Sequence, residues 1–175
     1  MTTPAADEKT RFELVVLPHL DAAYNLARWL TGNENDARDM VQEASLRAFK
    51  FFGGFRGGDA RAWLLTIVRN TVYTWLERRR SSRQVFEDED EIEKLEDVSV
   101  NPARLLDRNA TIEVVQSAIA ELVPEFREAV VLREMEGFSY KEIADITGVR
   151  IGTVMSRLAR GRRELQRILE KGATP

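Results

Sequence analysis

The clearest pattern of apolar and polar positions lies near the carboxyl end of the chain, in residues 138–169. Ser139 and Glu142 have the spacing of a capping box, which predicts a short helix beginning near Tyr140. Gly148 stands where the turn between two helices often needs a positive φ angle. Beyond the turn, apolar or small residues recur every three or four positions, as on a helix packed along one side. These residues are Val154, Leu158, Gly161, Leu165 and Ile168. The pattern predicts a helix-turn-helix.

The amino-terminal half shows three further helical patterns. Apolar residues from 12 to 30 have mostly helical spacing, and Gly32 is placed to end that helix. Asp36 can cap a second helix, whose inward stripe consists of Met40, Val41, Ala44, Ala48 and Phe52. Two glycine pairs in FGGFRGGDA then predict a flexible loop. The third helix follows as RAWLLTIVRNTVYTWLERRR, so we expect an all-α fold.

Charge divides the chain into three parts. Residues 1–80 hold 12 basic and 10 acidic side chains, residues 81–110 hold 4 and 9, and residues 111–175 hold 10 and 10. The middle part contains EDEDEIEKLED and too few apolar residues for a core. We therefore predict two small helical domains, 11–80 and 109–171, joined by an acidic flexible linker over 81–108. A solubilising spacer and a mimic of nucleic acid are equally compatible with this linker.

Composition narrows the classes of function. The 175 residues can bury one medium core or two small ones, and no run of about 18 apolar residues or secretion signal appears. We expect a cytoplasmic protein without membrane insertion. The absence of cysteine excludes disulfides and cysteine-ligated zinc, and His19 is the only histidine. We find no catalytic constellation, P-loop or dinucleotide fingerprint, so we expect no enzyme activity, no cofactor and no metal.

The outer face of the last helix carries candidate DNA contacts. Between positions 150 and 167 there are six arginines and one acidic residue, although the whole chain has a net charge of −3. Arginine pairs bidentately with guanine in the major groove, and Thr or Ser reaches base edges or phosphates. A solvated helix would also carry charge, but the one-sided balance favours DNA. The candidate contacts are Arg150, Thr153, Ser156, Arg157, Arg160 and Arg163.

Two other helix faces have more than one interpretation. The third helix alternates aromatic and basic side chains, a mixture that suits single-stranded DNA. Aromatic residues at helical spacing belong to a core more often than to a ligand site, so we expect Trp63 and Trp75 to be buried. On the second helix an apolar residue stands among acids and amides, and spacing alone does not decide whether this face docks on a protein. That face consists of Asp39, Gln42, Glu43 and Leu46.

Three segments carry a family resemblance. In this order they are DARDMVQEASLRAFKFF, FRGGDARAWLLTIVRN and LVPEFREAVVLREMEGFSYKEIADITGVRIGTVMSRLARGRREL. Together they resemble the extracytoplasmic-function (ECF) group of bacterial RNA polymerase sigma factors, over roughly residues 12–80 and 110–169. That group keeps two of the sigma domains, conventionally called two and four, with a variable linker between them.

The resemblance implies a role for each face. The face with Asp39, Gln42, Glu43 and Leu46 matches the surface for the clamp-helices coiled coil of the polymerase's largest subunit. Phe55 and Arg56 match the loop that captures a flipped base during promoter melting, and the last helix matches the reader of the minus-thirty-five element. The set matching minus-ten recognition and melting is Phe55, Arg56, Arg69, Asn70, Tyr73, Arg78 and Arg79.

The function we expect is therefore binding without catalysis. A sigma factor docks on core RNA polymerase, with contacts to the clamp helices and the flap, and directs promoter recognition, DNA melting and transcription initiation. The resemblance also implies control by an anti-sigma factor, and because the chain ends soon after the last helix we expect a dissociable one. The alternative is a two-domain helix-turn-helix regulator that acts without polymerase, although no heptad seam or effector pocket is evident. A helical enzyme is disfavoured because catalytic residues are missing.

Overall fold

The computed structural model describes residues 4–86 and 108–172, and within these two ranges every regular element is a helix. The expected all-α fold is confirmed. The first range, which we call the N-terminal group, contains α1 (Pro4–Val16), η1 (Leu17–His19), α2 (Leu20–Thr31), α3 (Glu34–Phe51), η2 (Phe52–Gly54) and α4 (Ala60–Phe86). The second range, the C-terminal group, contains α5 (Arg108–Glu121), α6 (Pro124–Val130), the π-helical turn η4 (Val131–Met135), α7 (Tyr140–Thr147) and α8 (Ile151–Gly172).

The single helix predicted over residues 12–30 is wrong, because the structure divides it into α1 and α2. A 3₁₀ turn at Leu17–His19 separates the two helices. Pro18 lies inside this turn, where its missing amide hydrogen and its ring oppose a continuous α-helix. The predicted end at Gly32 is confirmed: its φ angle is 73°, and its amide donates to the Arg28 carbonyl at 3.0 Å.

Helix α3 begins earlier than predicted. The cap is Asn33, whose side-chain oxygen accepts hydrogen bonds from the amides of Asn35 at 2.8 Å and Asp36 at 3.2 Å. The prediction of Asp36 as the cap is therefore wrong, because Asn33 already satisfies the first free amides of the helix. Along α3, buried Ala44 and Ala48 belong to the inward stripe that the sequence predicts.

The predicted helix-turn-helix is confirmed in detail. The Ser139 hydroxyl accepts from the Glu142 amide at 3.2 Å, and the Glu142 carboxylate accepts from the Ser139 amide at 2.7 Å. Gly148 ends α7 with a φ angle of 70°. Val154, Leu158 and Gly161 on α8 are buried. The opposite face of α8 is thereby left to solvent.

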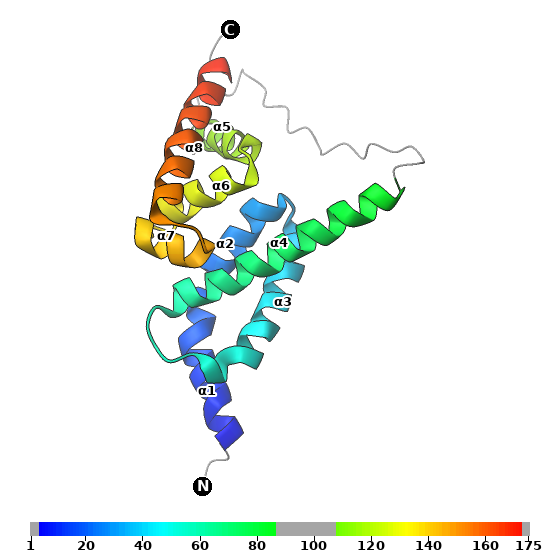
Figure 1. The fold of residues 1–175 in the computed structure, drawn as a ribbon, viewed down its shortest axis with the longest axis vertical. Coiled ribbons are helices and arrows are strands. Elements are labelled where there is room, and N and C mark those ends of the chain that lie inside the picture. The colour runs from blue at the N-terminus through cyan, green and yellow to red at the C-terminus, as the bar shows by residue number, and fades with distance from the viewer. Residues whose placement is uncertain (1–3, 87–107, 173–175) are drawn as a thin grey trace.

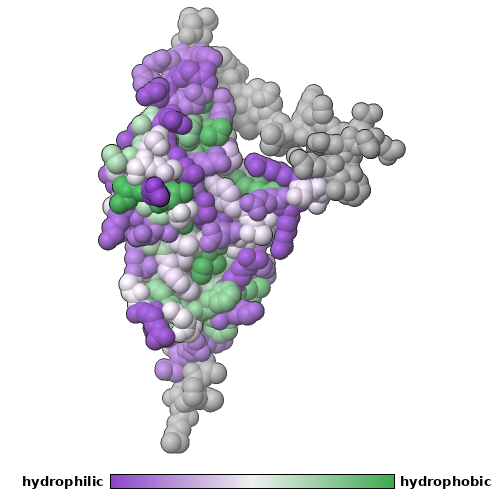
Figure 2. Space-filling model, in the orientation of Figure 1, coloured by the Kyte–Doolittle hydropathy of each residue, from purple (hydrophilic) through white to green (hydrophobic). Residues whose placement is uncertain are grey.

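The two groups pack against each other (Figure 1). Buried residues of α1–α4 and of α5–α8 form one hydrophobic cluster, with α2 and α4 contacting α6, η4 and α7. We call this packing the closed arrangement. In the view of Figure 2 the described surface is mostly hydrophilic, with hydrophobic side chains in small separate patches. The predicted linker starts at residue 81, but α4 continues to Phe86; residues 87–107 lie outside the described ranges.

We predict that Gly161→Ala destabilises the protein although alanine is the better helix former. A Cβ atom at this position would lie 3.0 Å from Val130 Cγ2 and 3.3 Å from Phe126 Cβ, where α8 crosses α6. Overpacking costs about 1–3 kcal/mol, against a gain of about 1 kcal/mol in helix propensity. The free energy of unfolding, measured by urea denaturation, should therefore fall.

Gly152→Ala is the matched control on the same helix. A Cβ atom there meets nothing within 4 Å, so this variant should be neutral or more stable by up to about 1 kcal/mol. Equal stabilisation by both alanines would contradict the close approach of α8 to α6.

Candidate nucleic-acid and partner interfaces

The arginine face of α8 lies open to solvent. Its exposed members are Arg150, Ser156, Arg160 and Arg163, while Thr153 and Arg157 are half-buried. The Ser156 hydroxyl donates to the Thr153 carbonyl at 3.0 Å, so it is already used within the helix. Four of the six predicted duplex contacts are therefore exposed, and the half-buried Arg157 has a charged neighbour on α6.

That neighbour is Glu128, a fully buried carboxylate on α6. Arg69 of α4 donates from Nε to Glu128 Oε1 at 2.7 Å, and the Tyr73 hydroxyl donates to Oε2 at 3.4 Å. Arg157 of α8 adds a positive charge that acts on the same carboxylate. The closed arrangement thus brings a predicted minus-ten arginine and a predicted minus-thirty-five arginine to one acidic side chain.

Burial dominates the electrostatics of this cluster. It raises the pKa of Glu128 above its ordinary value, and the charge and hydrogen bond of Arg69 oppose this rise only in part. The pKa of Tyr73 is also raised, first by burial and then by the Glu128 charge. The Arg69 guanidinium lies 4.4 Å from the centre of the Tyr73 ring and donates to Asn70 Oδ1 at 3.2 Å. Three predicted DNA contacts are therefore engaged within the protein.

Two further arginines join the groups. Arg61 of α4 donates from Nη2 to the Glu136 carbonyl at 2.6 Å, and its guanidinium lies 4.2 Å from the centre of the Phe138 ring. Arg127 of α6 donates from Nη1 to the Trp29 carbonyl of α2 at 2.9 Å. Both hydrogen bonds join the N-terminal group to the C-terminal group. They are strong because the donor, the guanidinium group, carries a charge.

The loop predicted to capture a base presents only part of its candidate pair. Phe55 is 8% exposed, and its ring packs 5.8 Å from that of Phe52 and 5.1 Å from that of Trp63, measured between ring centres. In this conformation the Phe55 ring is packed within an aromatic cluster, and its role in capturing a base stays a prediction. Arg56 is exposed.

The far end of α4 remains open. Arg78 is exposed, and Arg79 makes an ion pair with Asp36 of α3 at 3.4 Å. The Arg79 guanidinium also lies 5.2 Å from the centre of the Trp75 ring. Trp63 and Trp75 are both half-buried, so the prediction that they are buried holds only in part.

The candidate docking face on α3 combines charge with exposed apolar area. Asp39 and Gln42 are exposed, Leu46 is 63% exposed, and Glu43 makes an ion pair with Arg47 at 2.8 Å. The face continues one turn further than the sequence predicted, to Phe51, which is 60% exposed. A shallow depression is lined by Glu43, Leu46, Arg47, Lys50 and Phe51.

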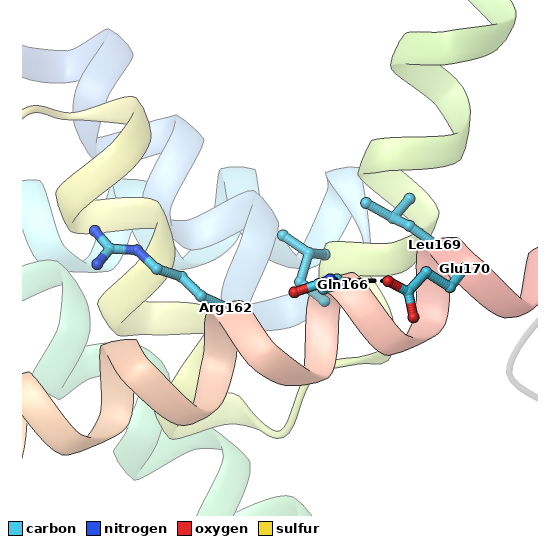
Figure 3. Close-up of a pocket in the computed structure, with 5 residues that line it drawn as sticks. Arg162, Gln166, Leu169 and Glu170 are labelled. Carbon is cyan, nitrogen blue, oxygen red and sulfur yellow. Dashed lines mark hydrogen bonds between the residues drawn. The ribbon is translucent and has the colours of Figure 1, made fainter.

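A second depression lies near the end of α8 (Figure 3). It is lined by Arg162, Leu165, Gln166, Leu169 and Glu170, and Gln166 Nε2 donates to Glu170 Oε1 at 2.8 Å. Its lining brings together no nucleophile with a base. Among the described residues, no group of histidine, aspartate and glutamate side chains is arranged to hold a metal ion. No helix in the described ranges is long and apolar enough to cross a membrane.

Comparison with known families decides between the alternatives. The family described as sigma-70 region 2 matches residues 15–82, and the family described as sigma-70 region 4 matches residues 112–165. The ECF RNA polymerase sigma-E factor of Escherichia coli is 34% identical over 165 residues, covering 89% of this chain and 84% of that protein. The chain belongs to the ECF sigma factors. The regulator alternative is not favoured.

Other relatives agree with this assignment. ECF RNA polymerase sigma factor SigE of Mycolicibacterium smegmatis is 37% identical over 157 residues; the match covers 90% of this sigma factor but only 61% of SigE. The sigma factor RpoE from Bartonella quintana, solved in complex with the anti-sigma factor NepR, has a TM-score of 0.73 and 32% identity, covering 94% of this sigma factor and 97% of RpoE. Both groups of helices therefore have counterparts in one solved sigma factor.

Sequence reasoning missed the residues that join the two groups. The mostly apolar segment from Leu122 to Leu132 contains three charged residues, Glu125, Arg127 and Glu128. Charges inside such a segment are the one signal that could have drawn attention to Arg127 and Glu128. Nothing in the sequence pairs Glu128 with Arg69, which lies 59 positions away.

The raised pKa of Glu128 predicts a pH dependence of stability with a definite sign. The folded state holds this proton more tightly than the unfolded chain does. The stability that this bound proton contributes is therefore complete below 4.5, the ordinary pKa of a glutamate carboxyl group. It is lost as pH rises through the pKa that Glu128 has in the folded state. We expect the free energy of unfolding of the wild type, relative to that of Glu128→Gln, to fall as pH rises from about 4.5.

Urea denaturation at a series of pH values measures this difference. Glu121→Gln removes an exposed carboxylate from α5 and controls for general charge effects. If the free energy of unfolding of the wild type instead rises with pH relative to that of Glu128→Gln, the effect of Arg69 on the pKa of Glu128 is larger than that of burial. Our assignment of the dominant cause would then be wrong.

Proposed function

We propose that this sigma factor binds core RNA polymerase through α3, reads promoter DNA through α4 and α8, and directs the start of transcription at a specific set of promoters. The observation that carries the proposal is the helix-turn-helix of α7 and α8, with its arginines exposed along one face. It occurs in the same chain as a separate, partly apolar face on α3.

The α3 face suits a protein partner. Interfaces draw most of their affinity from a few desolvated anchors surrounded by polar residues. Leu46 and Phe51 supply exposed apolar side chains, while Asp39, Gln42 and Glu43 supply polar groups beside them. We propose that this face binds the clamp helices of the polymerase's largest subunit, as the family resemblance implies. The C-terminal group would then contact the flap.

The α8 face suits duplex DNA. A recognition helix enters the major groove with its amino-terminal residues nearest the base edges. Arg150 and Thr153 lie at that end of α8, and Arg160 and Arg163 lie further along, where phosphates are the nearer acceptors. We assign this face to the minus-thirty-five element.

The α4 surface suits the melted minus-ten region. Arg56, Arg78 and Arg79 are positioned to hold a backbone, and Arg69, Asn70 and Tyr73 to meet bases once the closed arrangement has opened. The polymerase supplies the chemistry of RNA synthesis, so the proposed role of this chain is binding and positioning. That role places it in the cytoplasm with the polymerase.

A dissociable anti-sigma factor is the proposed regulator. Support comes from two similar solved proteins. RpoE was solved with the anti-sigma factor NepR, and CnrH, at a TM-score of 0.65 and 25% identity, was solved with the cytosolic domain of CnrY. An inhibitor that covers the α3 face or the α8 arginines would block a surface that the proposed function needs.

We predict that Glu43→Lys and Leu46→Ala each weaken binding to core RNA polymerase by about tenfold or more, because each changes the centre of the α3 face. Fluorescence anisotropy of labelled protein titrated with core enzyme measures the affinity. Glu13→Lys and Leu14→Ala on α1 are matched controls, since Glu13 is exposed and Leu14 is 74% exposed. Equal affinities of all four variants for core RNA polymerase would contradict the proposal that the α3 face binds it.

We predict different effects from two arginines of α8. Arg150→Ala should change the duplex sequences that holoenzyme selects from a random library, because a base contact is worth about 1–3 kcal/mol of discrimination. Arg163→Ala should leave the selected sequence unchanged but reduce the salt dependence of binding by about one unit of slope. The same sequence change from both variants would contradict this division of α8.

A further inference from the structure

We propose that an apolar stripe on α8, formed by Ile151, Met155 and Ala159, selects thymine in the duplex element that this sigma factor reads. The stripe would do so by contact with thymine methyl groups in the major groove. The inference rests on the proposed function in one respect, namely that α8 enters the major groove of promoter DNA. It adds a preference for a base that the arginines of α8 do not supply.

Helical spacing builds the stripe. Its members are four positions apart, so they lie one above the other along one side of α8. Ile151 is 45% exposed and Met155 is 53% exposed, and Ala159 is exposed as well. The buried residues of α8 are others, so packing within the described part of the chain does not account for the stripe.

Positive charge borders the stripe. Ser156, Arg160 and Arg163 are exposed on the adjoining part of α8, and residues 150–167 include six arginines and one acidic residue. A single exposed apolar side chain is common on protein surfaces, but this stripe lies within a strongly positive surface that favours an anionic partner. Duplex DNA offers phosphates to the arginines and apolar groups to the stripe.

The apolar group that DNA offers in the major groove belongs to thymine. The other bases present hydrogen-bond donors and acceptors at that edge, whereas thymine also presents its C5-methyl group. An apolar side chain that covers this methyl group removes apolar surface from water and needs no hydrogen-bond partner of its own. Methionine is flexible enough to fit an irregular surface. Arg150 would therefore read hydrogen-bonding edges, and the stripe would read methyl groups.

The length of the stripe indicates how many base pairs it covers. Successive members are separated by about 6 Å along the helix axis, because each residue rises about 1.5 Å. Base pairs of duplex DNA are about 3.4 Å apart, so two successive members match methyl groups about two base-pair steps apart. We therefore expect the selected element to contain a short run rich in A·T pairs.

Removal of single methyl groups from the DNA tests the proposal. Holoenzyme first selects a sequence from duplexes whose upstream element is randomised, and each thymine of that sequence is then replaced in turn by deoxyuridine, which keeps the base pair and lacks the methyl group. Competition against a fluorescein-labelled duplex of the selected sequence measures affinity. Deoxyuridine should weaken binding about threefold to fivefold at one or more positions, as expected for burial of one methyl group. A selected element without thymine, or affinity that no deoxyuridine changes, would overturn the proposal.

Two variants of Met155 assign the effect to the stripe. Met155→Gln replaces the apolar end of the side chain with an amide of similar length and leaves the charge unchanged, so the loss caused by deoxyuridine should disappear at the thymine that Met155 covers. Met155→Leu keeps the apolar surface and should keep the loss, which a merely structural role of Met155 does not explain. An undiminished loss at every thymine in Met155→Gln would overturn the proposal.

Met135→Gln is the matched control. Met135 is 45% exposed on η4, outside α8, so the same substitution there removes a similar apolar surface away from the stripe. Every effect of deoxyuridine should persist in this variant. Disappearance of the same effect in Met135→Gln and in Met155→Gln would show that the stripe is not its source and would also overturn the proposal.

Failure of this inference is distinguishable from failure of the proposed function. Holoenzyme that selects no duplex sequence at all would refute the reading of promoter DNA by α8. Selection of a sequence whose binding is indifferent to thymine methyl groups would refute only the role of the stripe.

Discussion

The buried ion pair between Arg69 and Glu128 fixes how the two groups of helices meet. An ion pair that is removed from water loses hydration energy, and the attraction between its two charges barely compensates for that loss. The raised pKa of Glu128 is a sign of this desolvation cost. Removing one partner alone leaves an uncompensated buried charge, at about 3–5 kcal/mol. The pair therefore favours this placement of α6 beside α4 over placements that would leave the Glu128 carboxylate buried without a partner. The buried apolar cluster supplies the favourable energy.

Local rules predicted most of the fold. The capping box at Ser139 and Glu142 and the left-handed turn at Gly148 depend on neighbours within a few positions, so the sequence determines them. The errors arose where two local signals competed. Pro18 interrupted an otherwise continuous apolar pattern, and Asn33 capped α3 ahead of Asp36. Contacts between the groups were beyond such rules, because they join residues dozens of positions apart.

The candidate sites divide in the same way. Exposure of the α8 arginines and of Leu46 follows from helical periodicity, which the sequence carries. The surroundings of Arg69 and Phe55 do not follow from helical periodicity. A buried carboxylate from another helix pairs with Arg69, and an aromatic cluster encloses Phe55. The family resemblance implies that these residues contact promoter DNA, whereas in the closed arrangement their neighbours belong to the protein itself.

A double-mutant cycle across Arg69 and Glu128 tests this account most directly. The free energies of unfolding of the wild type, Arg69→Ala, Glu128→Ala and the double variant give the coupling between two residues that only the closed arrangement brings together. We predict a coupling within the range of about 0.5–3 kcal/mol found for contacting pairs, and near its upper end. Additivity to within about 0.3–0.5 kcal/mol, as for distant sites, would contradict the account, because the groups would then unfold without sharing this contact.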